Sequence, residues 1–210
     1  MGGTIARLAA EGHRITTLIM TDGCTAQYRH EKNLQDIIKQ KKSESEKANA
    51  LLGVDRVIFG DLPDMKLDTV PHIEVNAVIE KTVRDVKPAC IYTHFYGDLN
   101  LDHQMTYRSS IVAARPVYTN VVRHLYLYRV ASCTEWTPGT TTGTFLPNHF
   151  VSIEPYMDVK LNAIKAYQTE IRDFPHPRSL EAVESYDKAV GIAVGVNYAE
   201  QFMMVRSTLV

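Results

Sequence analysis

The sequence has few cysteines. Its 210 residues include three, Cys24, Cys90 and Cys133, and no two of them have the Cys-x-x-Cys spacing. An odd number of widely separated cysteines gives no sign of a disulfide framework. We therefore predict reduced thiols in a cytoplasmic protein, with Cys90 in the core of a strand.

Three further features are missing. The formal net charge is −1, without a basic stripe or an acidic tail, which argues against a nucleic-acid partner. No apolar run approaches the roughly 20 residues that cross a bilayer, and no segment resembles a signal peptide, so we expect no membrane partner. No Gly-x-Gly-x-x-Gly follows a predicted strand, which argues against a nucleotide-binding domain such as a methyltransferase. What remains is a chain long enough for one substantial core.

Short apolar runs alternate with amphipathic stretches along the chain. The predicted strands are Arg14–Met20, Arg56–Phe59, Ala89–Tyr92, Leu125–Val130 and His149–Ile153. The predicted helices are Ile5–Ala10, Ser43–Leu52, His72–Val86, the stretch from His103 to about Ala114, Val159–Glu170 and Ser179–Val190. The polar stretch Cys24–Gln40 is predicted to be a loop or a frayed helix, and Thr137–Gly143 a loop. This alternation predicts an α/β, doubly wound fold of parallel βαβ units, and the lack of a linker or repeat favours a single domain over residues 1–210.

The amino-terminal segment breaks this pattern. Gly2 and Gly3 open a helix, whereas in such folds a glycine pair follows the first strand, where the backbone passes close to a ligand. We therefore predict that the first strand of the sheet is missing. Because this would leave sheet edges unpaired, we expect a chain that aggregates or that recruits another strand or chain, as in a homo-oligomer.

The segment from Tyr92 to His103 carries the densest group of polar side chains. Its candidate functional residues are His94, Asp98, Asn100, Asp102 and His103. The segment follows a predicted strand and precedes a predicted helix, and open α/β sheets bind their ligands outside the carboxyl ends of their strands. Such nitrogen and oxygen donors suit a divalent metal ion, above all zinc.

Each of these residues also has a plainer interpretation. His103 is either a metal ligand or the cap of the helix that it opens, and Asp98 and Asp102 are either site residues or turn and N-cap residues. The spacing of the acidic residues also resembles the start of a calcium loop. That loop needs glycine at its sixth position and glutamate at its twelfth, where this chain has His103 and Ser109.

Several short motifs, taken together and in order, resemble the LmbE-like, or PIG-L, family of zinc-dependent N-deacetylases. The matching segments are Gly2–Ala6, Thr21–Gly23, Leu62–Asp64, Thr93–His94, Asp98–His103, Ala114–Pro116, Ser132–Trp136, Pro175–Ser179 and Tyr198–Phe202. The resemblance covers essentially the whole chain. It implies a Rossmann-like three-layer αβα sandwich with a mostly parallel sheet, and a hydrolase that removes an acetyl group from an N-acetylated sugar or sugar conjugate.

The resemblance also implies a zinc ion held by two histidines and an aspartate. His103 matches the second of these histidines. The first histidine, the aspartate and the general base belong to an Ala-His-Pro-Asp-Asp-Glu motif, expected immediately before Gly2 and not contained in this sequence. Two of the three expected zinc ligands are therefore absent, and we expect impaired activity in the chain as given. The alternative is a non-catalytic sugar-binding relative that lost its metal site.

The remaining roles follow from the same resemblance. Asp102 would fix the tautomer of a metal-binding histidine. His176 and Arg178 lie in a proline-bracketed loop that could place an acid or an anchor near the substrate. The residues expected to bind a small N-acetyl sugar or glycoconjugate are Asp98, Asn100, Arg115 and Arg178.

Overall fold

A computed structural model describes residues 1–24, 28, 30–117, 122–139 and 143–209. Parts of the predicted loops at 24–40 and 137–143 therefore lie outside the described residues. The chain forms two compact units. The first comprises Met1–Ile19, Tyr28–Ile58 and Phe150–Gln201, and the second comprises Met20–Gln27, Phe59–His149 and Phe202–Val210. The single domain over residues 1–210 stays a prediction.

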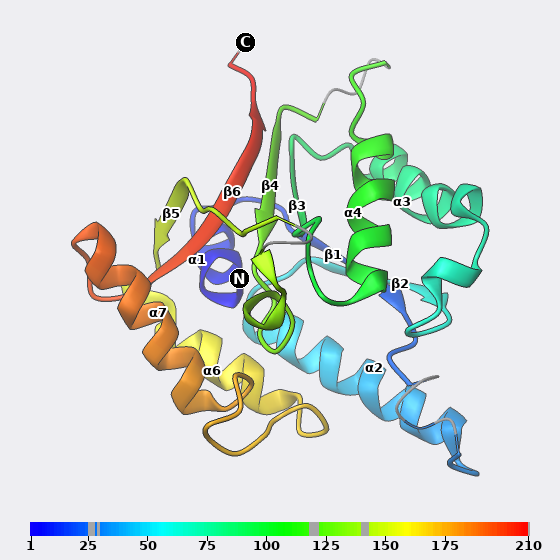
Figure 1. The fold of residues 1–210 in the computed structure, drawn as a ribbon, viewed down its shortest axis with the longest axis horizontal. Helices are drawn as coiled ribbons and strands as arrows, with labels where there is room; N and C mark the ends of the chain where they lie inside the picture. The colour runs from blue at the N-terminus through cyan, green and yellow to red at the C-terminus, as the bar shows by residue number, and fades with distance from the viewer. Residues whose placement is uncertain (25–27, 29, 118–121, 140–142, 210) are drawn as a thin grey trace. The chain divides into compact units, whose positions relative to one another are not determined.

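The second unit is built on neighbouring strands, shown in Figure 1. Strand β3 (Cys90–His94) pairs in parallel with β4 (His124–Tyr128), in a register that joins Cys90 to His124 and His94 to Tyr128. Strand β4 also pairs antiparallel with β6 (Ala199–Ser207). Because β3 and β4 are parallel, the loops that follow them leave the sheet at the same edge.

Two helices of the second unit, α3 (His72–Val86) and α4 (Leu101–Ala113), pack side by side (Figure 1). The N-cap of helix α4 is Asn100, not one of the residues considered from the sequence (Asp98, Asp102 and His103). The Asn100 side chain accepts a hydrogen bond from the Asp102 backbone N–H at 2.8 Å. Helix α3 ends at Lys87, which has a left-handed backbone (φ 55°) just before Pro88. Two short 3-10 helices, η1 (Leu67–Thr69) and η2 (Thr134–Trp136), complete the described helical segments of this unit.

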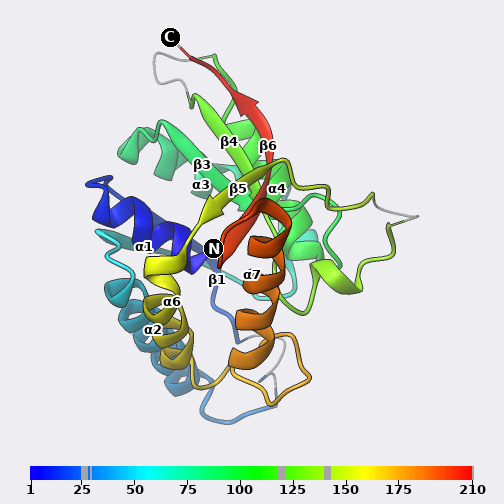
Figure 2. The same cartoon turned by 90° about the vertical axis from the view of Figure 1, so that its left-hand side faces the viewer.

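The first unit contains helices as well as parts of strands. It holds α1 (Gly2–Ala10), α2 (Leu34–Leu51), η3 (Glu154–Tyr156), α6 (Met157–Ala166) and α7 (Leu180–Val194). Helices α2 and α6 lie side by side, as Figure 2 shows, and the core between α1, α2 and α6 consists of Ala6, Ala48, Leu52 and Ala163. The small side chains of the three alanines let the helices approach closely. Gly3 serves the same purpose, because a Cβ atom there would lie 2.8 Å from Ile153.

The amino-terminal turn of α1 is held by a buried acid of the first unit. The Glu200 carboxylate accepts hydrogen bonds from the backbone N–H groups of Gly3 at 3.2 Å and Thr4 at 2.8 Å. These are among the N–H groups that a helix cannot satisfy internally. Glu200 also pairs with Lys160 at 2.5 Å, and Lys160 pairs with Asp187. Lys160, Asp187 and Glu200 are all buried.

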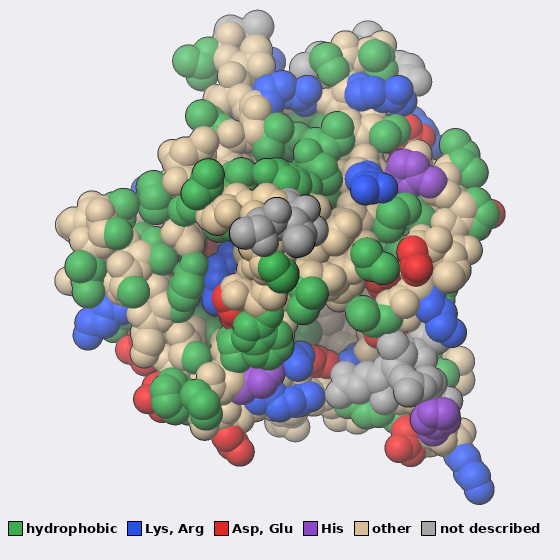
Figure 3. Space-filling view, viewed as in Figure 1, with side chains coloured by type: hydrophobic (Ala, Val, Ile, Leu, Met, Phe, Trp, Pro, Cys, Tyr) green, Lys and Arg blue, Asp and Glu red, His purple; other side chains and the backbone are tan. Residues whose placement is uncertain are grey.

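The remaining strands run through both units. Strands β1 (Thr16–Thr21) and β2 (Arg56–Leu62) form a two-stranded sheet, and β5 (His149–Ser152) is the last strand of the sheet ordered β3-β4-β6-β5. None of the described helices is long and apolar enough to cross a lipid bilayer. Figure 3 shows basic and acidic side chains dispersed over the visible face, without a continuous basic stripe among the described residues.

The predicted α/β fold class is confirmed, and most of the predicted elements have counterparts in the structure. Two predictions of local structure were wrong. Helix α2 begins at Leu34, not at Ser43, so it includes the end of the stretch that was predicted to be a loop or a frayed helix. Strand β6 was not predicted, and it makes the sheet partly antiparallel.

Candidate metal centre

The loop after β3 folds back on itself before α4 begins. The Asp98 carboxylate accepts the Asn100 backbone N–H at 3.3 Å, and the Gln104 side-chain amide donates to the Asp98 carbonyl at 2.7 Å. These bonds fix Asp98 over the first turn of α4. His103 lies in this same turn, so the cap of the helix and the candidate ligand come from one short segment.

The Asp98 side chain is fully buried and faces two groups. One carboxylate oxygen, Oδ2, accepts the Thr134 hydroxyl at 2.9 Å, from the loop that follows β4. The other oxygen, Oδ1, lies 3.4 Å from the Nδ1 atom of His103. Asp98 therefore joins the two loops that leave the sheet at the same edge.

Three donor side chains meet at this point. One ligand atom from each of Asp98, His103 and Cys133 lies within 4.8 Å of the others. The Nδ1 atom of His103 is buried and has no hydrogen-bond partner among the described residues. Buried polar atoms are rarely left without a partner, so this atom calls for an explanation. A carboxylate, an imidazole nitrogen and a thiol suit a zinc ion, so the residues fit the metal that the sequence predicts.

The His103 ring is supported by a second histidine. The rings of His94 and His103 are stacked, with centroids 4.3 Å apart and planes inclined by 22°. The Tyr128 hydroxyl lies 3.0 Å from the Nε2 atom of His94. Burial, assisted by the neighbouring His103, lowers the pKa of His94 well below its ordinary value, so His94 is neutral. Burial and then the charge of Asp98 raise the pKa of Tyr128, which stays a phenol and can donate to His94.

Asp102 has a different task from the one that the resemblance implies. Its carboxylate accepts the backbone N–H groups of Met65 at 2.6 Å and Leu67 at 2.9 Å. Burial raises the pKa of Asp102, and these two hydrogen bonds oppose the rise. Asp102 thus anchors the loop after β2 to α4. The carboxylate that faces the Nδ1 atom of His103 is that of Asp98.

The structure does not bring Arg115 to this group of side chains. Arg115 follows the carboxyl end of α4, whereas His103 lies in its first turn, and twelve residues of helix span about 18 Å. The Arg115 side chain donates to the Val112 carbonyl at 2.9 Å and lies 4.0 Å from Glu80. Asn100 is close to the group but serves as the N-cap of α4.

His176 and Arg178 belong to the first unit. The Nδ1 atom of His176 accepts the Arg178 backbone N–H at 3.1 Å, so Nε2 is the nitrogen that carries the hydrogen in the neutral form of the ring. The Arg178 guanidinium pairs with Glu170, which also pairs with Lys41 at 2.6 Å. The Nε atom of Arg178 is buried without a partner among the described residues. The roles of His176 and Arg178 at the site stay predictions.

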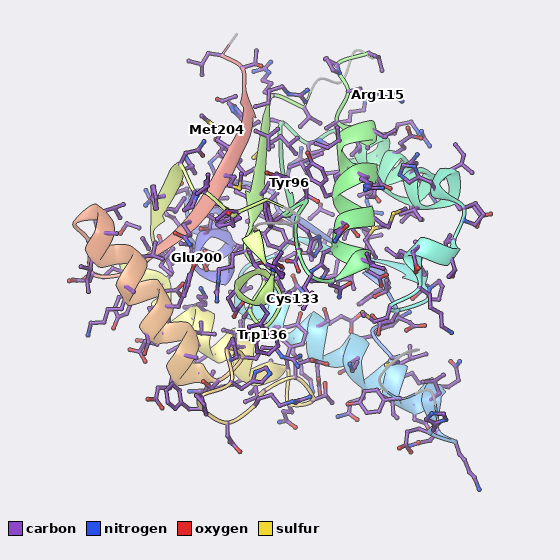
Figure 4. All side chains as sticks on the ribbon, in the orientation of Figure 1. Tyr96, Arg115, Cys133, Trp136, Glu200 and Met204 are labelled. Carbon is purple, nitrogen blue, oxygen red and sulfur yellow. The ribbon has the colours of Figure 1, made fainter. Side chains whose placement is uncertain are left out.

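Sequence reasoning missed Cys133 as a donor. Cys133 lies between the end of β4 and η2, and Figure 4 shows it on the same short segment as Trp136. Its position could have pointed to this role, because Cys133 follows β4 and Asp98 follows β3. The loops after two parallel neighbouring strands meet at one edge of the sheet. The neighbouring Glu135 anchors its own loop, where it accepts bonds from Arg129 and from the Ser132 N–H, both at 2.9 Å.

The chain has an α/β fold, and its donor side chains gather at the edge of the sheet where two parallel strands end. These features define the Rossmann-like class, whose members bind ligands at that edge. Comparison of the sequence with known protein families identifies the family. PIG-L, GlcNAc-PI de-N-acetylase, matches residues 1–114, more than half of the chain. The chain therefore belongs to the PIG-L family, which confirms the resemblance found in its motifs.

Individual relatives agree with this assignment. YaiS of Escherichia coli (strain K12), described as an uncharacterised deacetylase, is 29% identical over 177 residues, covering 80% of this chain and 82% of that protein. The N,N'-diacetylchitobiose deacetylase of Pyrococcus horikoshii has the same fold, with a TM-score of 0.78, 22% identity, and coverage of 98% of this chain and 78% of that one. GalB of Pseudomonas putida KT2440, a 4-carboxy-2-hydroxymuconate hydratase, has a TM-score of 0.77 and 18% identity, covering 100% of this chain and 91% of that one. The fold thus serves more than one reaction.

Proposed function

We propose that this protein is a zinc-dependent N-deacetylase that hydrolyses the acetamide of an N-acetylated sugar or sugar conjugate. The observation that carries the proposal is the buried, unpartnered Nδ1 atom of His103, which faces Asp98 in a chain of a deacetylase family. The named activity of the diacetylchitobiose deacetylase supports the sugar substrate, and the nitrogen, oxygen and sulfur donors support zinc over magnesium or calcium.

The chain's own residues would prepare this chemistry. When bound, zinc supplies a Lewis acid that polarises an amide carbonyl and makes water more acidic. Asp98 and His103 would hold the metal ion. The neutral His94, stacked on His103 and bonded to Tyr128, keeps the ring of the ligand in place. Asp102 positions the loop that precedes η1 by binding its backbone N–H groups.

His176 is proposed to anchor the substrate through a hydrogen bond. Because its Nδ1 atom accepts the Arg178 N–H, its Nε2 atom carries the proton of the neutral ring and can donate it in a hydrogen bond. Arg178 is proposed to bind the substrate through the guanidinium N–H groups that Glu170 does not use.

The test is the release of free amine from N-acetylglucosamine and N,N'-diacetylchitobiose by the zinc-loaded protein. We expect amine release to fall at least 100-fold in His103→Ala and to be unchanged in His13→Ala, a matched control because His13 is exposed. Equal activity in His103→Ala and the unmodified protein would refute the assignment. A protein that binds the sugar and zinc without releasing amine would instead be the non-catalytic relative.

A further inference from the structure

We propose that one end of the second unit docks on a membrane surface that contains anionic lipids. We call this surface the basic end. Its basic residues are Arg84, Lys87, Arg115, Arg123 and Arg206, and its exposed apolar residues are Val117, Val205 and Leu209. The inference goes beyond the proposed function, because strands β3 and β4 begin at this end, whereas the candidate metal centre lies where they finish.

Four segments that are far apart in the sequence meet at the basic end. The Arg123 backbone N–H donates to the Ala89 carbonyl at 2.8 Å, and the Arg123 carbonyl accepts the Thr208 N–H at 3.0 Å. The Arg206 guanidinium donates to the Ala114 carbonyl at 2.6 Å. All these contacts lie within the second unit. They hold the residues before β3, after α4, before β4 and at the end of β6 together as one surface.

Positive charge predominates at the basic end. The acidic side chains described beside its basic residues are Glu80 and Asp85. The Glu80 carboxylate lies 4.0 Å from the Arg115 guanidinium, which is more than half exposed. Lys87 and Arg123 are exposed and make no ion pair among the described residues. At the upper end of Figure 3, Lys and Arg side chains lie beside hydrophobic ones. The surface therefore attracts anions.

Apolar side chains are exposed beside these charges. Val117 is 60% exposed, Val205 47% and Leu209 92%. The segments 111–128 and 201–210, which supply them, contain no aspartate or glutamate. Exposed apolar side chains next to basic ones are typical of surfaces that lie on a lipid bilayer.

The chemistry of the surface selects the partner. A second copy of the chain in an isologous contact would place the arginines of the basic end against their own symmetry mates, which repel. A nucleic acid would pair with the arginines but would leave the apolar side chains against water or phosphate. A membrane with anionic lipids attracts the basic side chains and takes the apolar ones into the boundary between headgroups and acyl chains.

This partner differs from the expectation drawn from the sequence. The expectation of no membrane partner rests on the lack of a spanning segment, and docking at the surface does not require one. The net charge of −1 hides the basic end, because its residues come from distant segments. With the basic end on the membrane, the loops of the candidate metal centre leave the opposite edge of the sheet.

The experiment is flotation of the full chain with lipid vesicles, without metal or substrate. One set of vesicles is phosphatidylcholine alone, and the other contains about one quarter phosphatidylserine. We expect binding only to the anionic vesicles, and we expect it to fall as the salt concentration rises, because salt screens exposed charges. In the double variant Arg115→Glu and Arg123→Glu, we expect binding at least about tenfold weaker. The control Arg14→Glu changes an exposed arginine of the first unit and should bind as the unmodified protein does.

A second pair of variants leaves every charge in place. We expect Val117→Ser to weaken binding about threefold, because less apolar surface enters the bilayer. Ile73→Ser, at a position that is 71% exposed in the first turn of α3, is the control and should leave binding unchanged.

Three results would overturn the proposal. The first is a lack of binding to the anionic vesicles, or equal binding to both kinds of vesicle. The second is equal binding by the double variant and the unmodified protein. The third is tighter binding to a DNA duplex than to anionic vesicles at the same salt concentration, or a dimer that the double variant dissociates. Amine release is measured without vesicles, so the deacetylase and the docking surface can fail independently.

Discussion

His94 stacks on His103 and stays uncharged beside it. The ring centroids are 4.3 Å apart, and burial with the nearby His103 lowers the pKa of His94 well below its ordinary value. His94 therefore acts as a flat, neutral support for the candidate ligand His103. The Tyr128 hydroxyl holds His94 in place in turn.

This relationship predicts different effects for two substitutions of His94. His94→Phe keeps an aromatic ring against His103, and we expect its zinc affinity to stay within about threefold of the unmodified protein. His94→Ala removes the support, and because residues that orient ligands contribute about 10- to 100-fold to metal affinity, we expect a loss in that range. Competition with a chromophoric chelator measures both. Similar affinities for the two variants would contradict a role for the stacked ring.

Asp98→Asn separates metal binding from stability. Without metal, the substitution removes a buried charge and keeps the shape of the side chain, so we expect a melting temperature equal to or above that of the unmodified protein. With zinc at 100 times its dissociation constant, the unmodified protein should gain about 2.7 kcal/mol in unfolding free energy. Asp98→Asn should gain much less at the same zinc concentration. Equal zinc-induced shifts in calorimetry would show that Asp98 is not a ligand.

Trp136 lies close in sequence to the candidate metal centre. Its side chain is 52% exposed, and it lies three residues beyond Cys133. An indole ring can pack against the C–H face of a sugar ring and remove apolar surface from water. We expect Trp136→Ala to raise KM for diacetylchitobiose about tenfold with little change in kcat, and Trp136→Phe to raise it less. An unchanged KM in both variants, from steady-state amine release, would exclude this contact.

The sequence predicted the parts of the structure whose signal is local. The alternation of strands and helices is confirmed, and α4 begins at Leu101, two residues before the predicted start at His103. The predicted start of helix α2 was too late in the sequence. The buried face of this helix includes the polar residues Glu44, Ser45 and Asn49, so the pattern of hydrophobic residues does not reveal the helix. Glu44, for example, accepts the Thr169 hydroxyl at 2.7 Å.

Strand β6 and the candidate metal centre depend on contacts between distant segments. Strand β6 buries the charged Glu200 and exposes Met204 and Val205, the reverse of the pattern that predicts a strand. Cys133 joins Asp98 and His103 only because β3 and β4 are parallel neighbours, and no local pattern encodes that pairing.

The buried charges of the first unit predict a stability that depends on Lys160. Burial alone lowers the pKa of Lys160, but Glu200 and Asp187 outweigh it and raise the value. Lys160→Met would leave two buried carboxylates without their partner, and removing one member of such a group costs about 3–5 kcal/mol. Urea unfolding measures the loss. Lys165→Met, at an exposed position of the same helix, is the control and should change stability by less than about 0.5 kcal/mol.

The buried charges of Lys160, Asp187 and Glu200 also make the stability of the protein depend on pH. Burial alone raises the pKa of Glu200, but Lys160 and the Thr4 N–H hold it well below its ordinary value of 4.5. The unfolded chain therefore binds the proton first as the pH falls, so the stability contributed by Glu200 is present above pH 4.5 and is lost below it. Asp187 opposes this effect, because burial raises its pKa. We expect Glu200→Gln to be less stable than the unmodified protein at neutral pH and to lose less stability on acidification below pH 4.5. Parallel curves of unfolding free energy against pH for the two proteins would contradict this prediction, because they would show that Glu200 is not an ionised partner of Lys160 in the folded protein.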